Sequence, residues 1–146
     1  MRICPDLSLV VPCYREEANL IDLHAAVEAA LGQRLNWELV LVDDGSPDNT
    51  LQVATDLAKQ DRRVKVIGFS RNFGKEAAML AGLEYSSGQR VVIMDGDLQH
   101  PPSLIPEMLK KWTRRTQIRL SRGGIEPGIR QYAPGFRACT IGLLIP

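Results

Sequence analysis

The sequence contains no apolar run long enough to cross a membrane and no recognisable secretory signal peptide. A bilayer span needs about 20 consecutive apolar residues, and no run in the 146 residues approaches that length. The charged start of the chain is not followed by the long apolar segment of a signal peptide. We therefore expect a cytoplasmic protein without a transmembrane helix.

Cysteine is scarce as well. Cys4, Cys13 and Cys139 lack the close spacing of metal-binding cysteines, and three cysteines cannot pair completely. This excludes a cysteine-ligated zinc site and a disulfide-rich scaffold, and it favours a reducing compartment.

The net charge is close to neutral but is unevenly distributed. With 45% hydrophobic and 24% charged residues, the composition is that of a soluble globular protein, and the length suits one domain with a core. Residues 1–107 hold 10 basic and 16 acidic side chains, a net charge of −6, whereas residues 108–146 hold 8 basic side chains and one acid, a net charge of +7. This break indicates a tail with a separate role or origin.

Short runs rich in Val, Ile and Leu alternate with segments of helical period. Buried parallel strands have such a composition. The four runs are Leu7–Val11, Glu38–Val42, Val64–Phe69 and Arg90–Met94. This alternation predicts an α/β fold with a Rossmann-like, mostly parallel sheet, helices on both faces, and a ligand site beyond the carboxyl ends of the strands.

The helical segments have apolar residues at intervals of three and four. The first spans about residues 20–31, and the third runs from about Gly74 to Gly88. In the second, we expect Ser46 to cap the helix and Pro47 to occupy its first position. The fourth begins near residue 101 and is expected to bury Leu104, Ile105, Met108 and Trp112.

Each predicted strand is followed by a polar cluster. The clusters are Tyr14–Glu17, Asp43–Ser46, Ser70–Lys75 and Asp95–Asp97. Because parallel strands end at the same edge of a sheet, we expect these clusters to converge there.

The cluster after the fourth run has the most specific chemistry. If the chain continues extended, Asp95 and Asp97 project to the same side, and Gly96 leaves room between them for a ligand. Two carboxylates at a strand end favour a hard cation, and Mg²⁺ and Mn²⁺ commonly share their coordination shell with phosphate oxygens. The pattern therefore predicts a substrate that carries phosphate.

Taken together, four motifs resemble those of the inverting family-two glycosyltransferases. The motifs lie in residues 10–17, 42–48, 70–75 and 94–102. They are most similar to those of polyprenyl-phosphate sugar transferases, the group that includes dolichyl-phosphate mannose synthase and bactoprenol glucosyltransferases. The resemblance covers about residues 1–112. It implies the nucleotide-diphospho-sugar transferase fold of the GT-A type, a nucleotide-sugar donor, Mg²⁺ or Mn²⁺, and a lipid-phosphate acceptor.

The resemblance also implies roles for individual residues. The residues matching the segment that surrounds the nucleotide are Pro12, Tyr14 and Glu16. Asp43 and Asp44 match the pair in which a carboxylate contacts the base or ribose. The metal and diphosphate site corresponds to Asp95, Asp97 and Gln99. The matched region contains no recognisable catalytic base.

Several residues in these motifs have alternative interpretations. Arg71 and Lys75 either face the donor phosphates or are solvated surface charges. His100 is either a metal ligand or a structural residue beside the site, because Pro101 fixes its backbone as extended.

We divide the chain into a donor-binding catalytic half, residues 1–112, and an irregular basic tail, residues 113–146. Relatives continue with further strands, so we expect a C-terminally incomplete fold whose tail derives from a truncation or a shifted reading frame. A segment at Ser121–Gly124 resembles, more weakly, an arginine segment that meets the acceptor phosphate.

The predicted function is transfer of a sugar, glucose in our interpretation, from a donor of the UDP-glucose or GDP-mannose type to undecaprenyl phosphate. The acceptor would bring the protein to the inner face of the membrane. We expect no nucleic-acid partner and leave a homo-oligomer open.

Three alternatives remain at this stage. A phosphatase of the haloacid dehalogenase type also carries Asp-x-Asp after a strand, but on the first strand. A nicotinamide-dependent dehydrogenase would need Gly-x-Gly-x-x-Gly at the first turn, which is absent. An inactive nucleotide-binding remnant is the third.

Overall fold

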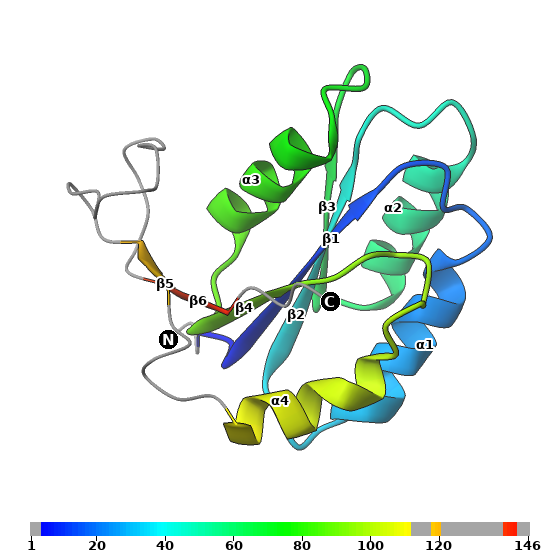
Figure 1. Cartoon of the computed structure of the whole chain (residues 1–146). Coiled ribbons are helices and arrows are strands. Elements are labelled where there is room, and N and C mark those ends of the chain that lie inside the picture. The colour runs from blue at the N-terminus through cyan, green and yellow to red at the C-terminus, as the bar shows by residue number, and fades with distance from the viewer. Residues whose placement is uncertain (1–3, 112–117, 121–138, 143–146) are drawn as a thin grey trace.

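A computed structural model of the chain describes residues 4–111, 118–120 and 139–142 (Figure 1). These residues form one sheet with strand order β3-β2-β1-β4-β6-β5. Strands β1 to β4 are mutually parallel where they pair, and β6 continues the parallel arrangement beside β4. The predicted Rossmann-like, mostly parallel sheet is confirmed.

Helices and strands alternate through most of the described chain. The strands are β1 Leu7–Cys13, β2 Trp37–Asp43, β3 Val64–Gly68, β4 Arg90–Ile93, β5 Ile118–Leu120 and β6 Cys139–Gly142. The helices are α1 Leu20–Leu31, α2 Thr50–Gln60, α3 Lys75–Tyr85 and α4 Ile105–Lys111, with a 3₁₀ turn, η1, at Pro102–Leu104.

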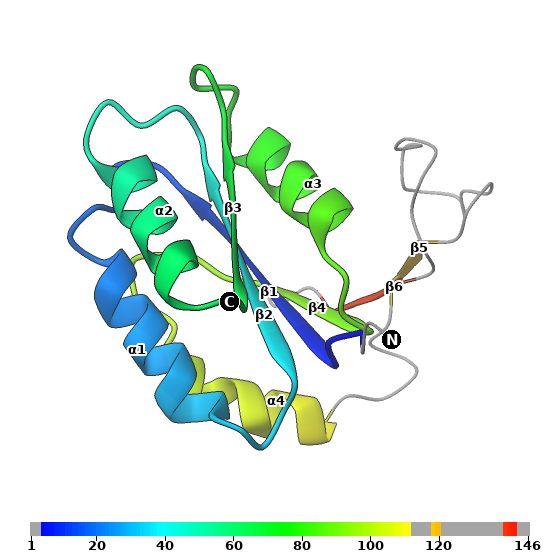
Figure 2. The same ribbon diagram turned by 180° about the vertical axis from the view of Figure 1, so that it is seen from behind.

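The sheet lies between two helical layers, as Figures 1 and 2 show from opposite sides. Alternate residues of β1 face opposite layers: Leu9 and Val11 belong to the core beneath α1, α2 and α4, whereas Val10 belongs to the core beneath α3. Both faces of the central strands are therefore buried, which explains their nearly continuous Val and Leu content.

Helix α3 lies directly against the sheet. A Cβ atom added at Gly82 would be 2.2 Å from Cγ1 of Val10, far inside normal contact. Only glycine allows this close packing, which brings the N-terminus of α3 to the edge where the strands end.

Helix α2 begins later than predicted. We expected Ser46 to cap it and Pro47 to begin it, but the helix starts at Thr50. The Ser46 hydroxyl instead accepts a hydrogen bond from the Arg15 backbone N–H at 3.0 Å. The expectation was wrong because this hydroxyl connects two loops, a long-range contact that no local pattern encodes.

The fourth helical segment is also less regular than predicted. It opens with the 3₁₀ turn, and α4 follows. Ile105 is buried as expected, but Leu104 is 46% exposed, so its predicted burial was wrong. Trp112 and the Ser121–Gly124 segment lie outside the described residues.

Strands β5 and β6 fall in the stretch for which the sequence pattern predicted no strand. Strand β6 pairs parallel with β4, and β5 pairs antiparallel with β6. Within the described part of the chain, no helix has both the length and the apolar character needed to span a bilayer.

Candidate functional site

The carboxyl ends of β1 and β4 define the centre of the candidate site. The chain runs outward from β1 through β2 to β3 and then returns to place β4 on the other side of β1. Ligands of open α/β sheets bind at such a reversal, outside the carboxyl ends of the strands. The polar clusters after these strands meet at this edge.

The loop after β1 is held against the loop after β2. The Glu16 backbone N–H donates to the Thr50 hydroxyl at 2.9 Å, next to the Arg15 bond to Ser46 described above. Arg15 has a left-handed backbone, with φ of 57°. Of the predicted nucleotide-binding residues here, Pro12 lies at the end of β1, and the Tyr14 side chain is 42% exposed.

Asp43, the last residue of β2, has an unusual carboxylate. It is only 2% exposed, and its Oδ2 atom accepts a hydrogen bond from the Ser46 backbone N–H at 3.2 Å. Its Oδ1 atom is buried and has no hydrogen-bond partner among the described residues. A buried carboxylate oxygen without a donor is costly, so Oδ1 is suited to accept a hydrogen bond from a ligand.

The neighbouring carboxylate of Asp44 is occupied by the protein itself. It accepts hydrogen bonds from the backbone N–H groups of Phe73, at 2.7 Å, and Gly74, at 3.0 Å. The two loops approach closely, because a Cβ added at Gly45 would be 2.3 Å from the Arg71 carbonyl carbon. Gly45 also has a φ of 67°, which favours glycine.

The two predicted basic residues lie in the loop after β3 and at the start of α3. The Arg71 guanidinium lies over the Phe73 ring, 4.1 Å from its centroid. Lys75 is the first residue of α3, and its Nζ atom lies 2.5 Å from Oδ1 of Asp95. Arg71 and Lys75 are both exposed, although each has a partner at this edge of the sheet, and their contact with donor phosphates stays a prediction.

The loop after β4 differs from the extended segment that we expected. Strand β4 ends at Ile93, the chain turns at Gly96 and Asp97, and Leu98 has a φ of 61°. The backbone N–H of Gln99 donates to Oδ1 of Asp97 at 3.1 Å, as in an Asx turn. The alternation of side chains along an extended strand therefore does not place Asp97 on the same side as Asp95, because the backbone turns at Gly96 and Asp97.

Glu16, in the loop after β1, lies beside the loop after β4. Its side chain lies beside Gly96, where an added Cβ would be 3.5 Å from the Glu16 Cγ atom. The Glu16 carboxylate accepts a hydrogen bond from the Asn19 side-chain amide at 2.6 Å. Glu16 thus lies between the ends of β1 and β4, and its predicted contact with the nucleotide stays a prediction.

The described residues do not form a complete metal site by themselves. Among them, no group of three or more His, Cys, Asp or Glu side chains is arranged to hold a metal ion. Asp95, Asp97 and Gln99 do supply hard oxygen donors at this edge, which suit Mg²⁺ or Mn²⁺ when phosphate and water complete the coordination shell. The residues fit a cation that binds together with a phosphate ligand.

Cys13 lies at the end of β1 but is not suited to nucleophilic chemistry. Burial, with additional effects from the negative charges of Glu16 and Asp43, raises the pKa of its thiol to about 12. Because the thiolate is the reactive form of cysteine, Cys13 is a structural residue at neutral pH.

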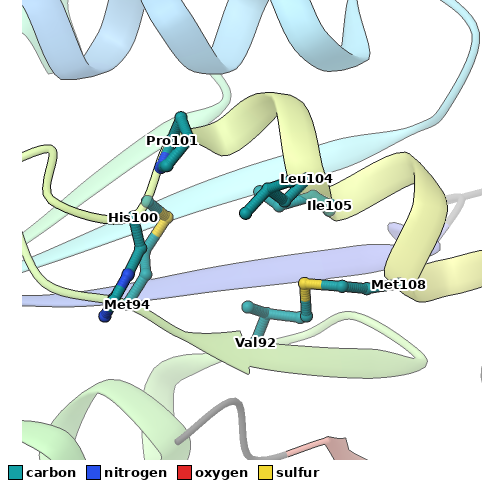
Figure 3. Close-up of a pocket in the computed structure, with 7 residues that line it drawn as sticks. All are labelled: Val92, Met94, His100, Pro101, Leu104, Ile105 and Met108. Atoms are coloured by element: carbon teal, nitrogen blue, oxygen red, sulfur yellow. The ribbon is translucent and has the colours of Figure 1, made fainter. Parts of the chain in front are cut away.

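A small apolar pocket lies between β4 and α4 (Figure 3). His100 lies beside Met94 in this pocket, and the other side chains are apolar. The lining residues are Val92, Met94, His100, Pro101, Leu104, Ile105 and Met108. This placement favours the structural interpretation of His100.

Comparison with known proteins identifies the family. The sequence profile described as "Glycosyl transferase family 2" matches residues 8–138. The chain belongs to glycosyltransferase family 2. The resemblance to this family is confirmed.

Two curated relatives illustrate the similarity. An uncharacterized glycosyltransferase of Synechocystis sp. is 41% identical over 142 residues, covering 94% of this chain and 44% of the relative. The dolichol-phosphate mannosyltransferase of Pyrococcus furiosus is 36% identical over 131 residues, covering 90% of this chain and 37% of the relative. The chain thus spans less than half the length of these relatives.

The fold also resembles that of solved proteins. A mannosyltransferase from Pyrobaculum calidifontis, solved in complex with GDP-Man and Mn²⁺, aligns with a TM-score of 0.67 and 23% identity. The alignment covers 82% of this chain and 36% of that protein. The similarity confirms the predicted GT-A type fold.

Proposed function

We propose that the chain is the donor-binding half of an inverting glycosyltransferase that acts on a polyprenyl phosphate. The sugar, glucose in our proposal, comes from a donor of the UDP-glucose or GDP-mannose type and goes to undecaprenyl phosphate. The observation that supports the proposal is Oδ1 of Asp43, which is buried, has no hydrogen-bond partner in the described part of the chain, and lies at the sheet edge that also holds Lys75 and Asp95. The name of the Pyrococcus relative, a dolichol-phosphate mannosyltransferase, supports a lipid-phosphate acceptor.

In this proposal, Asp43 recognises the nucleotide. Its Oδ1 accepts a hydrogen bond from an N–H of the base or a ribose hydroxyl, which satisfies the buried oxygen. In the same proposal, Pro12, Tyr14 and Glu16 contact the nucleotide sugar from the end of β1 and the loop that follows it. Asp44 contributes indirectly, because its carboxylate fixes the loop that leads to Lys75.

Breaking the bond between sugar and diphosphate leaves negative charge on the departing nucleoside diphosphate. Asp95, Asp97 and Gln99 would hold Mg²⁺ or Mn²⁺, which stabilises that charge as a Lewis acid when bound. Arg71 and Lys75 are two basic side chains at this edge that can neutralise phosphate oxygens. The acceptor needs little activation, since a phosphate monoester with a second pKa near 6 is largely a dianion at pH 7.

The proposal places the protein at the cytoplasmic face of the membrane, where a lipid-linked phosphate is accessible. It includes no nucleic-acid partner. A homo-oligomer and the division into residues 1–112 and 113–146 remain predictions.

Calorimetry with UDP, GDP and CDP sugars tests donor binding. We expect binding of one donor class to the full chain in the presence of Mn²⁺, and weaker binding after addition of EDTA. Asp97→Ala should abolish the metal dependence. If donor binding were metal-independent and equal in wild type and Asp97→Ala, the proposed role of Asp97 would be wrong.

A second assay addresses the acceptor. Donor with a radioactive sugar is incubated with the chain and vesicles that contain undecaprenyl phosphate, and lipid-linked sugar is extracted. Labelled lipid supports transfer, whereas metal-dependent nucleotide binding without labelled lipid supports the nucleotide-binding remnant. The phosphatase alternative is not favoured, because Asp-Gly-Asp follows β4 and not the first strand.

A further inference from the structure

The ion pair between Lys75 and Asp95 joins two loops of the candidate site. Lys75 begins α3, and Asp95 follows β4, twenty residues later in the chain. The Lys75 ammonium lies 2.5 Å from Oδ1 of Asp95, and the two side chains are 60% and 41% exposed. One oxygen of a predicted metal ligand is therefore paired with a cation that belongs to the protein.

The position of Lys75 is not explained by helix stability. A positive charge at a helix N-terminus is unfavourable, because the backbone N–H groups there already carry partial positive charge. The loop before Lys75 is nevertheless firmly placed, since Asp44 accepts hydrogen bonds from Phe73 and Gly74. Lys75 therefore lies at a helix end whose partial positive charge repels it, and its ammonium group faces Asp95.

We propose that Lys75 occupies Asp95 in the nucleotide-free protein and thereby makes cation binding depend on the nucleotide. This inference rests on the proposed function, because it assumes that Asp95 takes part in divalent-cation binding. A divalent cation that approaches Asp95 alone meets the Lys75 charge and must displace the ammonium from Oδ1.

A nucleoside diphosphate changes this balance. Its phosphate oxygens offer Lys75 an alternative anionic partner within reach of a flexible four-carbon side chain. Exposed ion pairs are weak, so the exchange of partners has a low energetic cost. Once Lys75 faces the diphosphate, both oxygens of Asp95 are available to a cation. The nucleotide and the cation therefore strengthen each other's binding. By thermodynamic reciprocity, each raises the affinity for the other by the same factor.

Titration of the full chain with Mn²⁺, followed by electron paramagnetic resonance of the free ion, tests this dependence without any measurement of activity. Affinity is measured with and without UDP for wild type and Lys75→Gln. We expect Lys75→Gln to bind Mn²⁺ alone roughly three- to tenfold more tightly than wild type, because the competing charge is gone. The factor by which UDP raises Mn²⁺ affinity should be smaller in the variant.

Two further variants separate direct competition from general charge repulsion. Lys75→Arg keeps a cation beside Asp95 and should retain wild-type behaviour. Arg71→Gln removes one positive charge from the loop before Lys75, where the Arg71 guanidinium stacks on the Phe73 ring. This variant should leave the Mn²⁺ affinity measured without nucleotide nearly unchanged. An equal gain in Lys75→Gln and Arg71→Gln would overturn the inference.

Different results refute the role of Lys75 and the proposed function. Unchanged or weaker Mn²⁺ binding in nucleotide-free Lys75→Gln overturns the role of Lys75, even if UDP and Mn²⁺ bind together in wild type. Failure of wild type to bind any nucleotide with Mn²⁺ overturns the proposed function itself. Circular dichroism of each variant verifies that the sheet and helices are retained.

Discussion

The carboxylate of Asp44 accepts a hydrogen bond from the backbone N–H of Phe73 at 2.7 Å, and so joins the end of β2 to the loop that precedes α3. Its neighbour Asp43 leaves one buried oxygen without a partner among the described residues. The two adjacent aspartates therefore differ in their hydrogen bonding: Asp44 holds a loop, and Asp43 keeps a buried oxygen that no described residue satisfies.

This difference predicts opposite results for two conservative substitutions. Asp44→Asn should lower the free energy of unfolding by about 1–3 kcal/mol, because it weakens the charge-assisted hydrogen bonds that the buried carboxylate accepts from the Phe73 and Gly74 backbone N–H groups. Asp43→Asn should affect stability less but weaken donor binding by tenfold or more. Urea denaturation and calorimetry measure the two effects, and Glu84→Gln, at an exposed position, is the matched control. Equal losses of stability in both variants would contradict the division of roles.

Helix α3 should tolerate no side chain at its closest contact with the sheet. In Gly82→Ala, the new Cβ would lie 2.2 Å from Cγ1 of Val10. We expect a loss of about 1–3 kcal/mol, because the helix must shift away from β1. Thermal unfolding measures the change.

Gly96→Ala is the control for this overpacking. A Cβ at Gly96 would meet Glu16 and Val11 at 3.5 Å, an ordinary contact distance. Stability should therefore be nearly unchanged. A Gly82→Ala variant as stable as Gly96→Ala would show that α3 can move at no cost.

The sequence is most informative where burial is continuous, and least informative where distant side chains meet. Runs such as Leu39–Val42 predict strands because both faces of the sheet are covered. The motifs also place Asp43 and Asp95 at one edge, since parallel strands end together. The turn at Asp97 and the pairing of Lys75 with Asp95 could not be predicted, because they depend on backbone torsions and contacts between separate loops.

The same reason explains the missed strands and the misassigned cap. Strand β6 contains Gly142 and pairs with β4 only after the chain has passed through a long basic segment. Ser46 has the residue type of a helix cap, but its hydroxyl bonds to Arg15 in another loop. In both cases a tertiary contact overrides the local pattern.

Arg63 connects three elements at the opposite end of the sheet. Its guanidinium lies over the Trp37 ring, 4.0 Å from the centroid, and donates to the carboxylates of Asp61 and Glu28. Hydrogen bonding from Arg63 holds the pKa of Asp61 well below its usual range. This cluster fixes the start of β3 against α1.

Arg63→Lys should therefore be destabilising although it retains the charge. Lysine lacks the planar group that stacks on Trp37 and bonds two carboxylates at once. We expect a loss of about 1–2 kcal/mol in the free energy of unfolding, measured by urea denaturation. Arg62→Lys, at the adjacent exposed position, should have little effect, and a similar loss in both variants would refute the specific role of Arg63.

The environment of the Glu38 carboxylate leads us to expect that the stability of the protein depends on pH. Its carboxylate is only 4% exposed, and burial by itself raises its pKa. Hydrogen bonds from Lys65, Ser8 and Ser87, together with the charge of Lys65, more than offset this effect, so that its pKa is lower than in the unfolded chain. Lys65 Nζ lies 2.7 Å from Oε2 of Glu38, and the Ser8 hydroxyl donates to Oε1 at 2.6 Å.

A carboxylate whose pKa is lower in the folded state stabilises the protein above its unfolded-state pKa, which is about 4.3 for glutamate. This contribution is lost as the pH falls through the folded-state pKa. We expect the free energy of unfolding to decrease below about pH 5, and Glu38→Gln to reduce that decrease while lowering stability at pH 7. Urea denaturation at several pH values between 3 and 7 measures both effects, with Glu84→Gln as control. If Glu38→Gln kept the full pH dependence of wild type below pH 5, the hydrogen bonds to Glu38 would not be its source.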